Sequence, residues 1–115
     1  MALILVIDDQ DMVRITCKRI LASAGHDVIE AASGDDGIAL YRDHRPALVL
    51  TDLLMPDKPG GETIAELRNG GADAKIVAMS GGDGLDLARS LGADEVLEKP
   101  FRADALLATV KKLIG

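Results

Sequence analysis

Short, mostly apolar runs that stop at polar residues are the feature that most limits how this chain of 115 residues can fold. Such runs fit the strands of a parallel β-sheet covered on both faces, because these strands need not alternate apolar and polar side chains. Four of the runs end at charged or hydroxyl side chains: residues 3–7 before Asp8 and Asp9, 47–51 before Asp52, 76–79 before Ser80, and 96–98 before Lys99. Since ligands bind beyond the carboxyl ends of the strands in open α/β sheets, these side chains form the candidate site.

The segments between the runs predict helices, because their apolar residues recur at helical spacing and stop at glycine or before proline. A further short strand is predicted at residues 28–31, and Ser33 with Asp36 three residues later is a helix-capping pattern. Helices are predicted over residues 11–24, 34–44 and 62–69, over a short segment ending near Leu91, and over the final segment with its apolar face of Leu106, Leu107, Val110, Leu113 and Ile114. This alternation predicts an α/β fold, (βα)5, with a doubly wound five-stranded parallel sheet in the flavodoxin-like order 2-1-3-4-5.

Composition and length exclude several classes of protein. We expect residues 1–115 to form a single domain, because a chain of this length buries about two-thirds of its unfolded surface in one core. The net charge of −6 argues against a nucleic-acid partner, since phosphate backbones are bound by Lys and Arg. Cys17 is the sole cysteine, which excludes an internal disulfide, and we expect it to be a small apolar residue on a helix. The first apolar run is too short for a signal peptide or a membrane span, so we predict a cytoplasmic protein with no membrane partner.

The predicted strand order makes the first and third strands neighbours, so Asp8, Asp9 and Asp52 should meet. Adjacent carboxylates repel by about 1–4 kcal/mol per pair at contact range, and a bound divalent cation is the simplest compensation. A few carboxylates with retained waters suit Mg²⁺. Ser80 and Lys99 should flank Asp52 and supply a hydroxyl and an ammonium. Together these groups predict a receptor for a phosphoryl group carried by Asp52, with Asp8 and Asp9 holding the cation.

The same residues, with their neighbours, form an ordered set that extends over the whole chain. The set consists of Asp8 and Asp9, Asp52 followed by Met55, Pro56 and Gly60, then Ser80, then Lys99, Pro100 and Phe101. In identity, order and spacing this set resembles the receiver domain of two-component response regulators.

The resemblance implies a role for each residue of the set. Asp52 would accept a phosphoryl group from a phosphohistidine on a sensor histidine kinase or a histidine phosphotransfer protein, and Ser80 and Lys99 would contact the phosphoryl oxygens. Asp9, Asp52 and the main-chain carbonyl of Leu54 would bind Mg²⁺, with Asp8 acting largely through water. The Lys99–Pro100 peptide bond would be cis. The protein would be no enzyme beyond catalysing its own phosphorylation and dephosphorylation, and phosphorylation would draw Ser80 inward and reshape the face of the fourth helix, fifth strand and fifth helix.

One position departs from the receiver pattern. Receivers carry Tyr or Phe three residues before the lysine, and that ring moves inward on phosphorylation, whereas this chain has Val96. Signalling could instead use the glycine-rich segment 81–84, or these glycines could only form a loose turn. Met12 and Ile15 lie off the inward face of the first predicted helix, and we expect them to be a docking surface for the phosphoryl donor or, alternatively, scattered exposed apolar residues.

Three other functions remain open at the level of sequence. A receiver-fold protein-binding module with weak or vestigial phosphorylation is compatible with Val96. A flavodoxin-like cofactor binder is disfavoured, because the acidic segment 8–11 would repel a bound phosphate. A phosphomonoester hydrolase with an aspartyl nucleophile is disfavoured too, because such enzymes carry the nucleophile after the first strand, whereas the best acceptor here, Asp52, follows the third.

Overall fold

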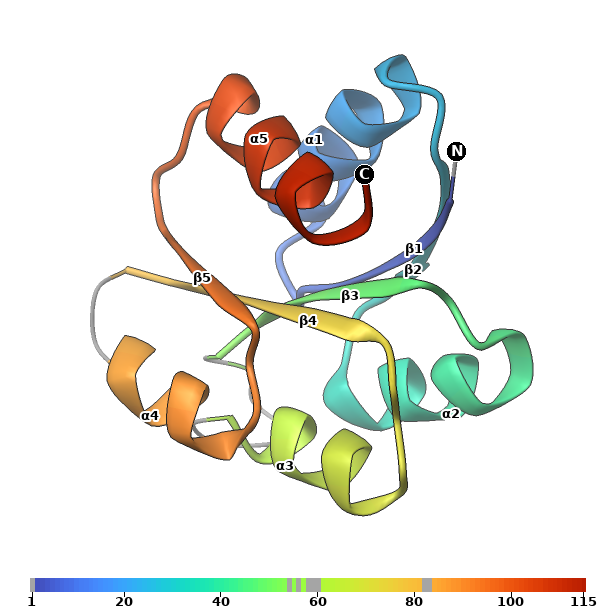
Figure 1. The fold of residues 1–115 in the computed structure, drawn as a ribbon, viewed down its shortest axis with the longest axis vertical. Helices are drawn as coiled ribbons and strands as arrows, with labels where there is room; N and C mark the ends of the chain where they lie inside the picture. Colours follow the sequence, from blue (N-terminus) through green and yellow to red (C-terminus); the bar gives the residue numbers. More distant parts are fainter. Residues whose placement is uncertain (1, 54, 56, 58–60, 82–83) are drawn as a thin grey trace.

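A five-stranded parallel sheet forms the centre of the molecule, with helices on both faces (Figure 1). The computed structural model describes residues 2–53, 55, 57, 61–81 and 84–115. The strands lie in the order β2-β1-β3-β4-β5, and they are β1 (Leu3–Ile7), β2 (Asp27–Ala31), β3 (Leu48–Asp52), β4 (Lys75–Ser80) and β5 (Glu95–Glu98). The predicted fold class and strand order are therefore confirmed.

Five helices connect the strands and cover the sheet unequally. They are α1 (Asp11–Ser23), α2 (Gly34–His44), α3 (Glu62–Asn69), α4 (Leu85–Leu91) and α5 (Ala103–Ile114). Figure 1 shows α1 and α5 on one face and α2, α3 and α4 on the other. The predicted elements are all present, with ends that differ by one or a few residues, and α4 is short at seven residues. No helix among the described residues is long and apolar enough to span a bilayer.

Successive residues of the strands face opposite sides of the sheet, which gives the core two layers. In β1, Ile4 and Val6 pack with the α1 and α5 side, whereas Leu5 and Ile7 pack with the α2–α4 side. All four side chains are fully buried. The continuous apolar runs thus follow from burial on both faces, as expected for a parallel sheet.

The start of α2 is fixed by local hydrogen bonds. The Ser33 hydroxyl accepts a hydrogen bond from the Asp36 main-chain N–H at 3.1 Å, as the capping pattern predicts. One turn into the helix, Gly37 lies against β1: a Cβ built on Gly37 would stand 2.3 Å from Ile7 Cδ1 and 2.7 Å from Ile7 Cγ1. Glycine at residue 37 therefore allows α2 to approach the sheet.

We expect Gly37→Ala to destabilise the protein by about 1–3 kcal/mol, because the added methyl group overpacks the core against Ile7. In a helix without such a contact the same substitution stabilises, by up to about 1 kcal/mol, through better helix propensity. The sign of the change in unfolding free energy, measured by urea denaturation followed by circular dichroism, distinguishes the two effects. A more stable Gly37→Ala variant would show that α2 can retreat from the sheet without cost.

Candidate functional site

The carboxyl ends of the central strands bring three carboxylates together. Ile7 of β1 pairs with Thr51 of β3, so Asp8 lies level with Asp52 on the neighbouring strand. Oxygen atoms of Asp8, Asp9 and Asp52 all lie within 4.8 Å of one another. Asp8 is 0% exposed and Asp52 is also buried, whereas Asp9 is exposed. Two buried carboxylates at this range require a compensating positive charge.

Lys99 supplies part of that positive charge. Its Nζ lies 2.9 Å from Asp8 Oδ2 and 3.4 Å from Asp52 Oδ1, and the Lys99–Pro100 peptide bond that follows is cis. Partial burial alone would lower the pKa of Lys99, but the hydrogen bond that Lys99 donates to Asp8 and the charges of Asp8 and Asp52 outweigh it and raise that pKa. Lys99 therefore stays an ammonium at neutral pH and bridges the two buried carboxylates.

The charges at this edge of the sheet suit a divalent cation. The carboxylates of Asp8, Asp9 and Asp52 carry −3 and the Lys99 ammonium carries +1, so these four groups together carry −2, which a divalent ion would neutralise. All the donor atoms in the cluster are oxygens, which is the ligand chemistry that Mg²⁺ prefers. Asp9, being exposed, can face both the ion and solvent. The residues present thus fit a magnesium site.

Ser80 lies at the end of β4, the strand that neighbours β3. Asp52 pairs with Met79 of β4, which places Ser80 one residue beyond that pair at the end of the strand, where it is buried. The main-chain N–H of Lys99 donates to the Ser80 carbonyl at 2.6 Å. Leu54, predicted to offer a carbonyl to the metal, and Pro56 and Gly60 of the sequence motif lie outside the described residues.

Comparison with known proteins identifies the family. Residues 4–111 match the response regulator receiver domain family. The chain belongs to that family. It is 36% identical to protein PilG of Pseudomonas aeruginosa over 113 residues, covering 94% of this chain and 84% of PilG. It is 33% identical over 116 residues to the chemotaxis protein CheY of Bacillus subtilis, with 97% of both chains covered. The crystal structure of chemotaxis protein CheY4 of Vibrio cholerae superposes with a TM-score of 0.91, at 26% identity and 99% coverage of both chains.

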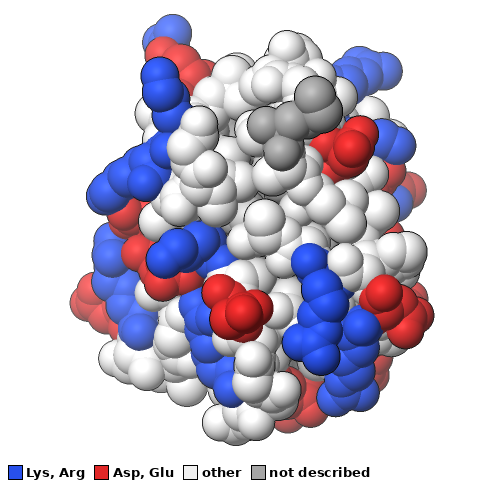
Figure 2. All heavy atoms as spheres, turned by 45° about the vertical axis from the view of Figure 1, so that its right-hand side comes forward, with Lys and Arg blue, Asp and Glu red and all other residues white. Residues whose placement is uncertain are grey.

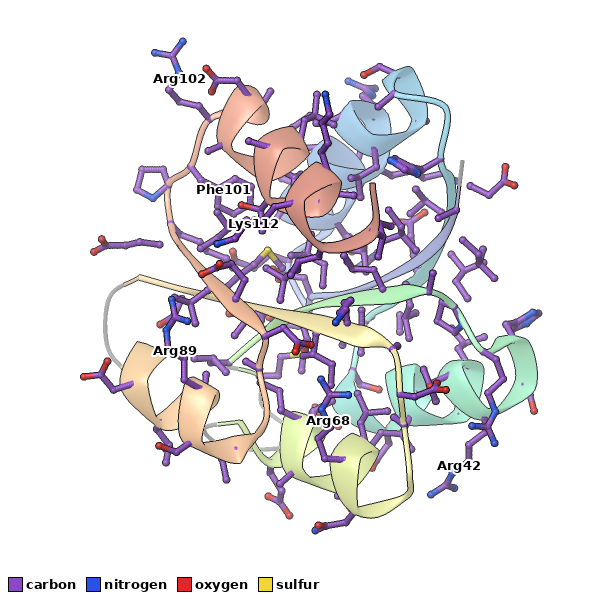
Figure 3. The ribbon with its side chains drawn as sticks, viewed as in Figure 1. Arg42, Arg68, Arg89, Phe101, Arg102 and Lys112 are labelled. Carbon is purple, nitrogen blue, oxygen red and sulfur yellow. The ribbon has the colours of Figure 1, made fainter. Side chains whose placement is uncertain are left out.

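In this receiver, Val96 occupies the middle of β5. It pairs with Ala78 of β4 and is partly buried against the core layer on the α2–α4 side. The neighbouring Glu95 accepts from Arg89 of α4 at 2.9 Å and from Lys112 of α5 at 2.7 Å. Figure 3 shows these two basic side chains reaching β5 from opposite faces of the sheet. The hydrogen bond from Lys112, followed by that from Arg89, lowers the pKa of Glu95 despite its partial burial.

An apolar groove of about 480 Å³ opens between α1 and the segment after β5. It is lined by Met12, Val13, Thr16, Cys17, Ile20, Lys99, Pro100 and Phe101. Met12 is 75% exposed at this groove, whereas Ile15, also exposed, is outside the lining. Cys17 forms part of the buried core as expected, and burial raises the pKa of its thiol to about 11. The groove adjoins the site through Lys99.

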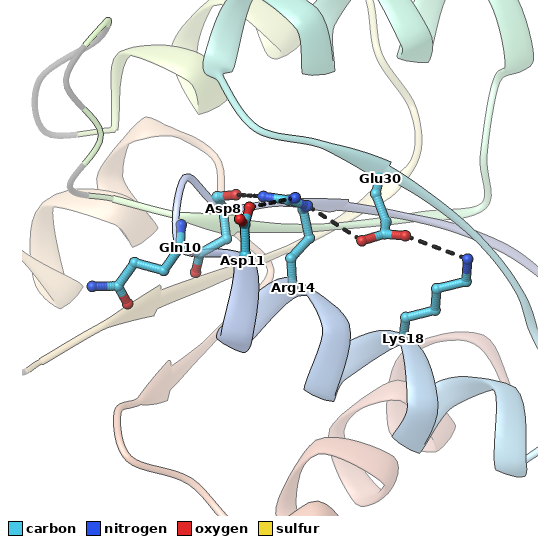
Figure 4. Close-up of polar contacts among 6 residues, drawn as sticks. All are labelled: Asp8, Gln10, Asp11, Arg14, Lys18 and Glu30. Atoms are coloured by element: carbon cyan, nitrogen blue, oxygen red, sulfur yellow. Dashed lines mark hydrogen bonds and ion pairs between the residues drawn. The ribbon is translucent and has the colours of Figure 1, made fainter.

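Three polar residues near the site were missed by sequence reasoning. Arg14 of α1 contacts both the Asp8 carbonyl and Glu30 of β2 (Figure 4). Asp57 accepts hydrogen bonds from the main-chain N–H groups of Gly34 and Asp35, so it ties the segment after β3 to the start of α2. The Asp11–Arg14 spacing could have indicated an ion pair within α1, but the other contacts depend on strand register and loop path.

The surface charge of the receiver is mixed. On the face drawn in Figure 2, basic and acidic side chains lie interspersed, and its described residues form no extended basic area. A phosphate backbone is bound by an array of Lys and Arg. The described residues of that face thus carry both signs of charge without such an array.

Proposed function

We propose that this receiver accepts a phosphoryl group on Asp52 from a phosphohistidine and thereby controls a partner protein or passes the group on. The observation that carries the proposal is the buried Asp8–Asp52 pair bridged by Lys99, at 2.9 and 3.4 Å, with Asp9 in the same cluster. A buried carboxylate flanked by a cation and a metal site is suited to nucleophilic attack on phosphorus. Outside its own phosphorylation and dephosphorylation we assign no catalytic activity.

Each residue of the site has a distinct task in this proposal. An oxygen of Asp52 attacks the phosphorus, the P–N bond breaks, and its electron pair leaves with the imidazole of the donor. Lys99 moves from the carboxylates to an oxygen of the transferred group, and the Ser80 hydroxyl donates to another. Asp9 and Asp52 would hold Mg²⁺, which would supply positive charge to the phosphoryl oxygens. Both oxygens of Asp8 already accept hydrogen bonds, from Lys99 and from the Gln10 N–H, which favours binding of the ion through water.

The groove beside α1 is the docking surface that we propose for the phosphoryl donor, a histidine kinase or a phosphotransfer protein. It is apolar, it carries the exposed Met12, and it ends at Lys99, next to the acceptor. A partner side chain that fills it would bring a phosphohistidine to the edge of the sheet. Ile15 lies one turn of α1 from Met12 and extends the contact outside the groove.

A binding module with vestigial phosphorylation is the second candidate, and Val96 is the observation that favours it. A valine already packed against the core has no ring to relocate when Ser80 moves. The ion pairs of Glu95 further connect α4, β5 and α5 in the unphosphorylated protein. In this alternative the receiver binds its partner in one conformation only.

The proposal predicts that the purified chain takes up one phosphoryl group from acetyl phosphate when Mg²⁺ is present and none when a chelator removes it. Intact-mass spectrometry measures the uptake, and peptide mapping after borohydride reduction of the acyl phosphate locates it at Asp52. The dependence on Mg²⁺ follows from the local charge of −2, which repels an incoming phosphate unless the ion is bound. A folded protein that stays unlabelled under both conditions would contradict phosphoacceptance and support the binding module.

A further inference from the structure

Arg14 joins three elements of the structure at the edge of the site. Its Nη1 donates to the main-chain carbonyl of Asp8 at 2.9 Å, its Nε to Glu30 of β2 at 3.2 Å, and its Nη2 to Asp11 of α1 at 2.7 Å (Figure 4). The side chain is only 16% exposed. A planar guanidinium with donors in a fixed fork can hold all three acceptors in set directions. Two carboxylates thereby hold Arg14 in place, and its third hydrogen bond goes to the Asp8 carbonyl just after β1.

The carbonyl that Arg14 holds belongs to the peptide unit between Asp8 and Asp9. That unit is planar, so a donor that fixes the Asp8 carbonyl also fixes the direction in which the chain continues to Asp9. The two carboxylates differ in how they are held. Asp8 receives hydrogen bonds from Lys99 and from the Gln10 N–H, whereas within the described part of the chain no side chain or main-chain group bonds to the Asp9 carboxylate. The location of Asp9 therefore depends on its backbone.

We propose that Arg14 is a positioning residue for the metal site, which orients Asp9 by holding the peptide unit before it. The inference rests on the proposed function, in which Asp9 and Asp52 bind Mg²⁺. Arg14 would act in the metal-free protein, where it keeps the exposed Asp9 carboxylate within 4.8 Å of Asp8 and Asp52 against their mutual repulsion. Because Arg14 also donates to Glu30 of β2, that strand would help to hold Arg14 in its position beside the site.

If Arg14 acted through its charge alone, it would weaken the binding of Mg²⁺ instead of supporting it. A positive group close to the three carboxylates repels an incoming cation, so its removal would strengthen Mg²⁺ binding. A positioning role means that its removal weakens binding, because Asp9 is no longer held where the ion needs it. Lys18 provides the matched control: its Nζ pairs with the same Glu30 at 3.3 Å, but it has no contact with the Asp8 carbonyl.

The test is titration of the whole chain with Mg²⁺ by isothermal titration calorimetry. We expect Arg14→Ala to weaken binding by about tenfold, the scale on which groups behind metal ligands act. Arg14→Lys keeps the charge but loses the fork and should also bind several-fold more weakly, and it serves as the second variant if Arg14→Ala does not fold. Lys18→Ala should bind as tightly as the wild type or tighter. Equal or tighter binding by both Arg14 variants would overturn the positioning role.

A second readout needs no metal. The Gln10 N–H, which donates to Asp8 Oδ1 at 2.9 Å, should exchange its hydrogen faster in the metal-free Arg14 variants than in the wild type or Lys18→Ala. Unchanged exchange in those variants would contradict the proposal.

The proposed metal site and the proposed role of Arg14 can be refuted separately. A wild-type protein that binds no Mg²⁺ refutes the metal site, whereas a wild type that binds Mg²⁺ with unaffected Arg14 variants refutes only the role of Arg14.

Discussion

Asp52→Asn is expected to abolish phosphorylation by acetyl phosphate at every Mg²⁺ concentration. The neutral amide of asparagine is a poor nucleophile, so residue 52 would no longer offer an acceptor to the phosphoryl group. Uptake is measured by intact-mass spectrometry. Asp57→Asn is the matched control, because it makes the same chemical change five residues further along the chain, at an exposed aspartate that caps α2, and asparagine keeps one acceptor oxygen there. The control should be labelled like the wild type.

The same variant should gain less stability from Mg²⁺ than the wild type. Asp52→Asn removes one of the three carboxylates that gather with Asp8 and Asp9, so the variant offers a divalent ion fewer charged oxygen ligands. The shift in the midpoint of thermal unfolding on addition of Mg²⁺ measures this difference. Labelling of the Asp52→Asn protein at another residue would show that the acceptor has been misassigned.

Arg68→Ala is expected to destabilise the fold by about 3 kcal/mol, more than any single ion pair at the surface would cost. From α3, its guanidinium donates to the carbonyls of Gly92, Ala72 and Ala74 at 3.0, 2.9 and 2.8 Å and to Asp94 at 2.7 Å. Asp94 in turn accepts from the Ile76 N–H of β4 at 2.9 Å. The Arg68 side chain is only 23% exposed, so water replaces these hydrogen bonds poorly once it is removed.

Arg89→Ala is the control for that prediction. Among the described residues Arg89 has a single ion pair, to Glu95, and its side chain is 50% exposed, so its loss should cost under about 1 kcal/mol. Figure 3 shows Arg68 beneath the sheet and Arg89 on α4. Urea denaturation followed by circular dichroism gives both values. Because Arg68 lies at the amino end of β4, away from the site, the folded variant should still be phosphorylated. Equal stability losses in the two variants would show that the contacts of Arg68 are replaced by water.

The sequence was sufficient to predict the fold and the edge of the sheet at which the candidate site residues lie. Apolar runs without alternation identified buried parallel strands, and the residue after each run was thereby placed at the edge where ligands bind. Asp8, Asp52, Ser80 and Lys99 all follow from that single pattern. To predict that these residues lie close together, the strand order was also needed, and the alternation of strand and helix indicated it.

The supporting contacts could not be predicted, because they depend on geometry that no local pattern encodes. Arg14 reaches the Asp8 carbonyl only because α1 packs beside β2 with Glu30 at one level of the sheet. Arg68 and Asp94 are far apart in the chain and meet through the packing of α3 against the turn before β5. The Asp57 carboxylate accepts a hydrogen bond from the Gly34 N–H at the start of α2, and this contact depends on the path of the chain after β3. Each contact joins residues more than ten positions apart or a side chain to a main-chain atom, where residue type carries little information.

The hydrogen bond between the Lys99 N–H and the Ser80 carbonyl gives a common backbone support to the two residues that we propose to contact the phosphoryl group. At 2.6 Å it is short, and it lies at the end of the β4–β5 pairing. A displacement of the end of β4 toward Asp52 would carry the base of Lys99 with it. The Ser80 hydroxyl and the Lys99 ammonium would then move together, because the hydrogen bond between β4 and β5 couples their main chains. Under the proposed function, this hydrogen bond would connect a displacement of Ser80 to β5 in a protein that has valine at residue 96.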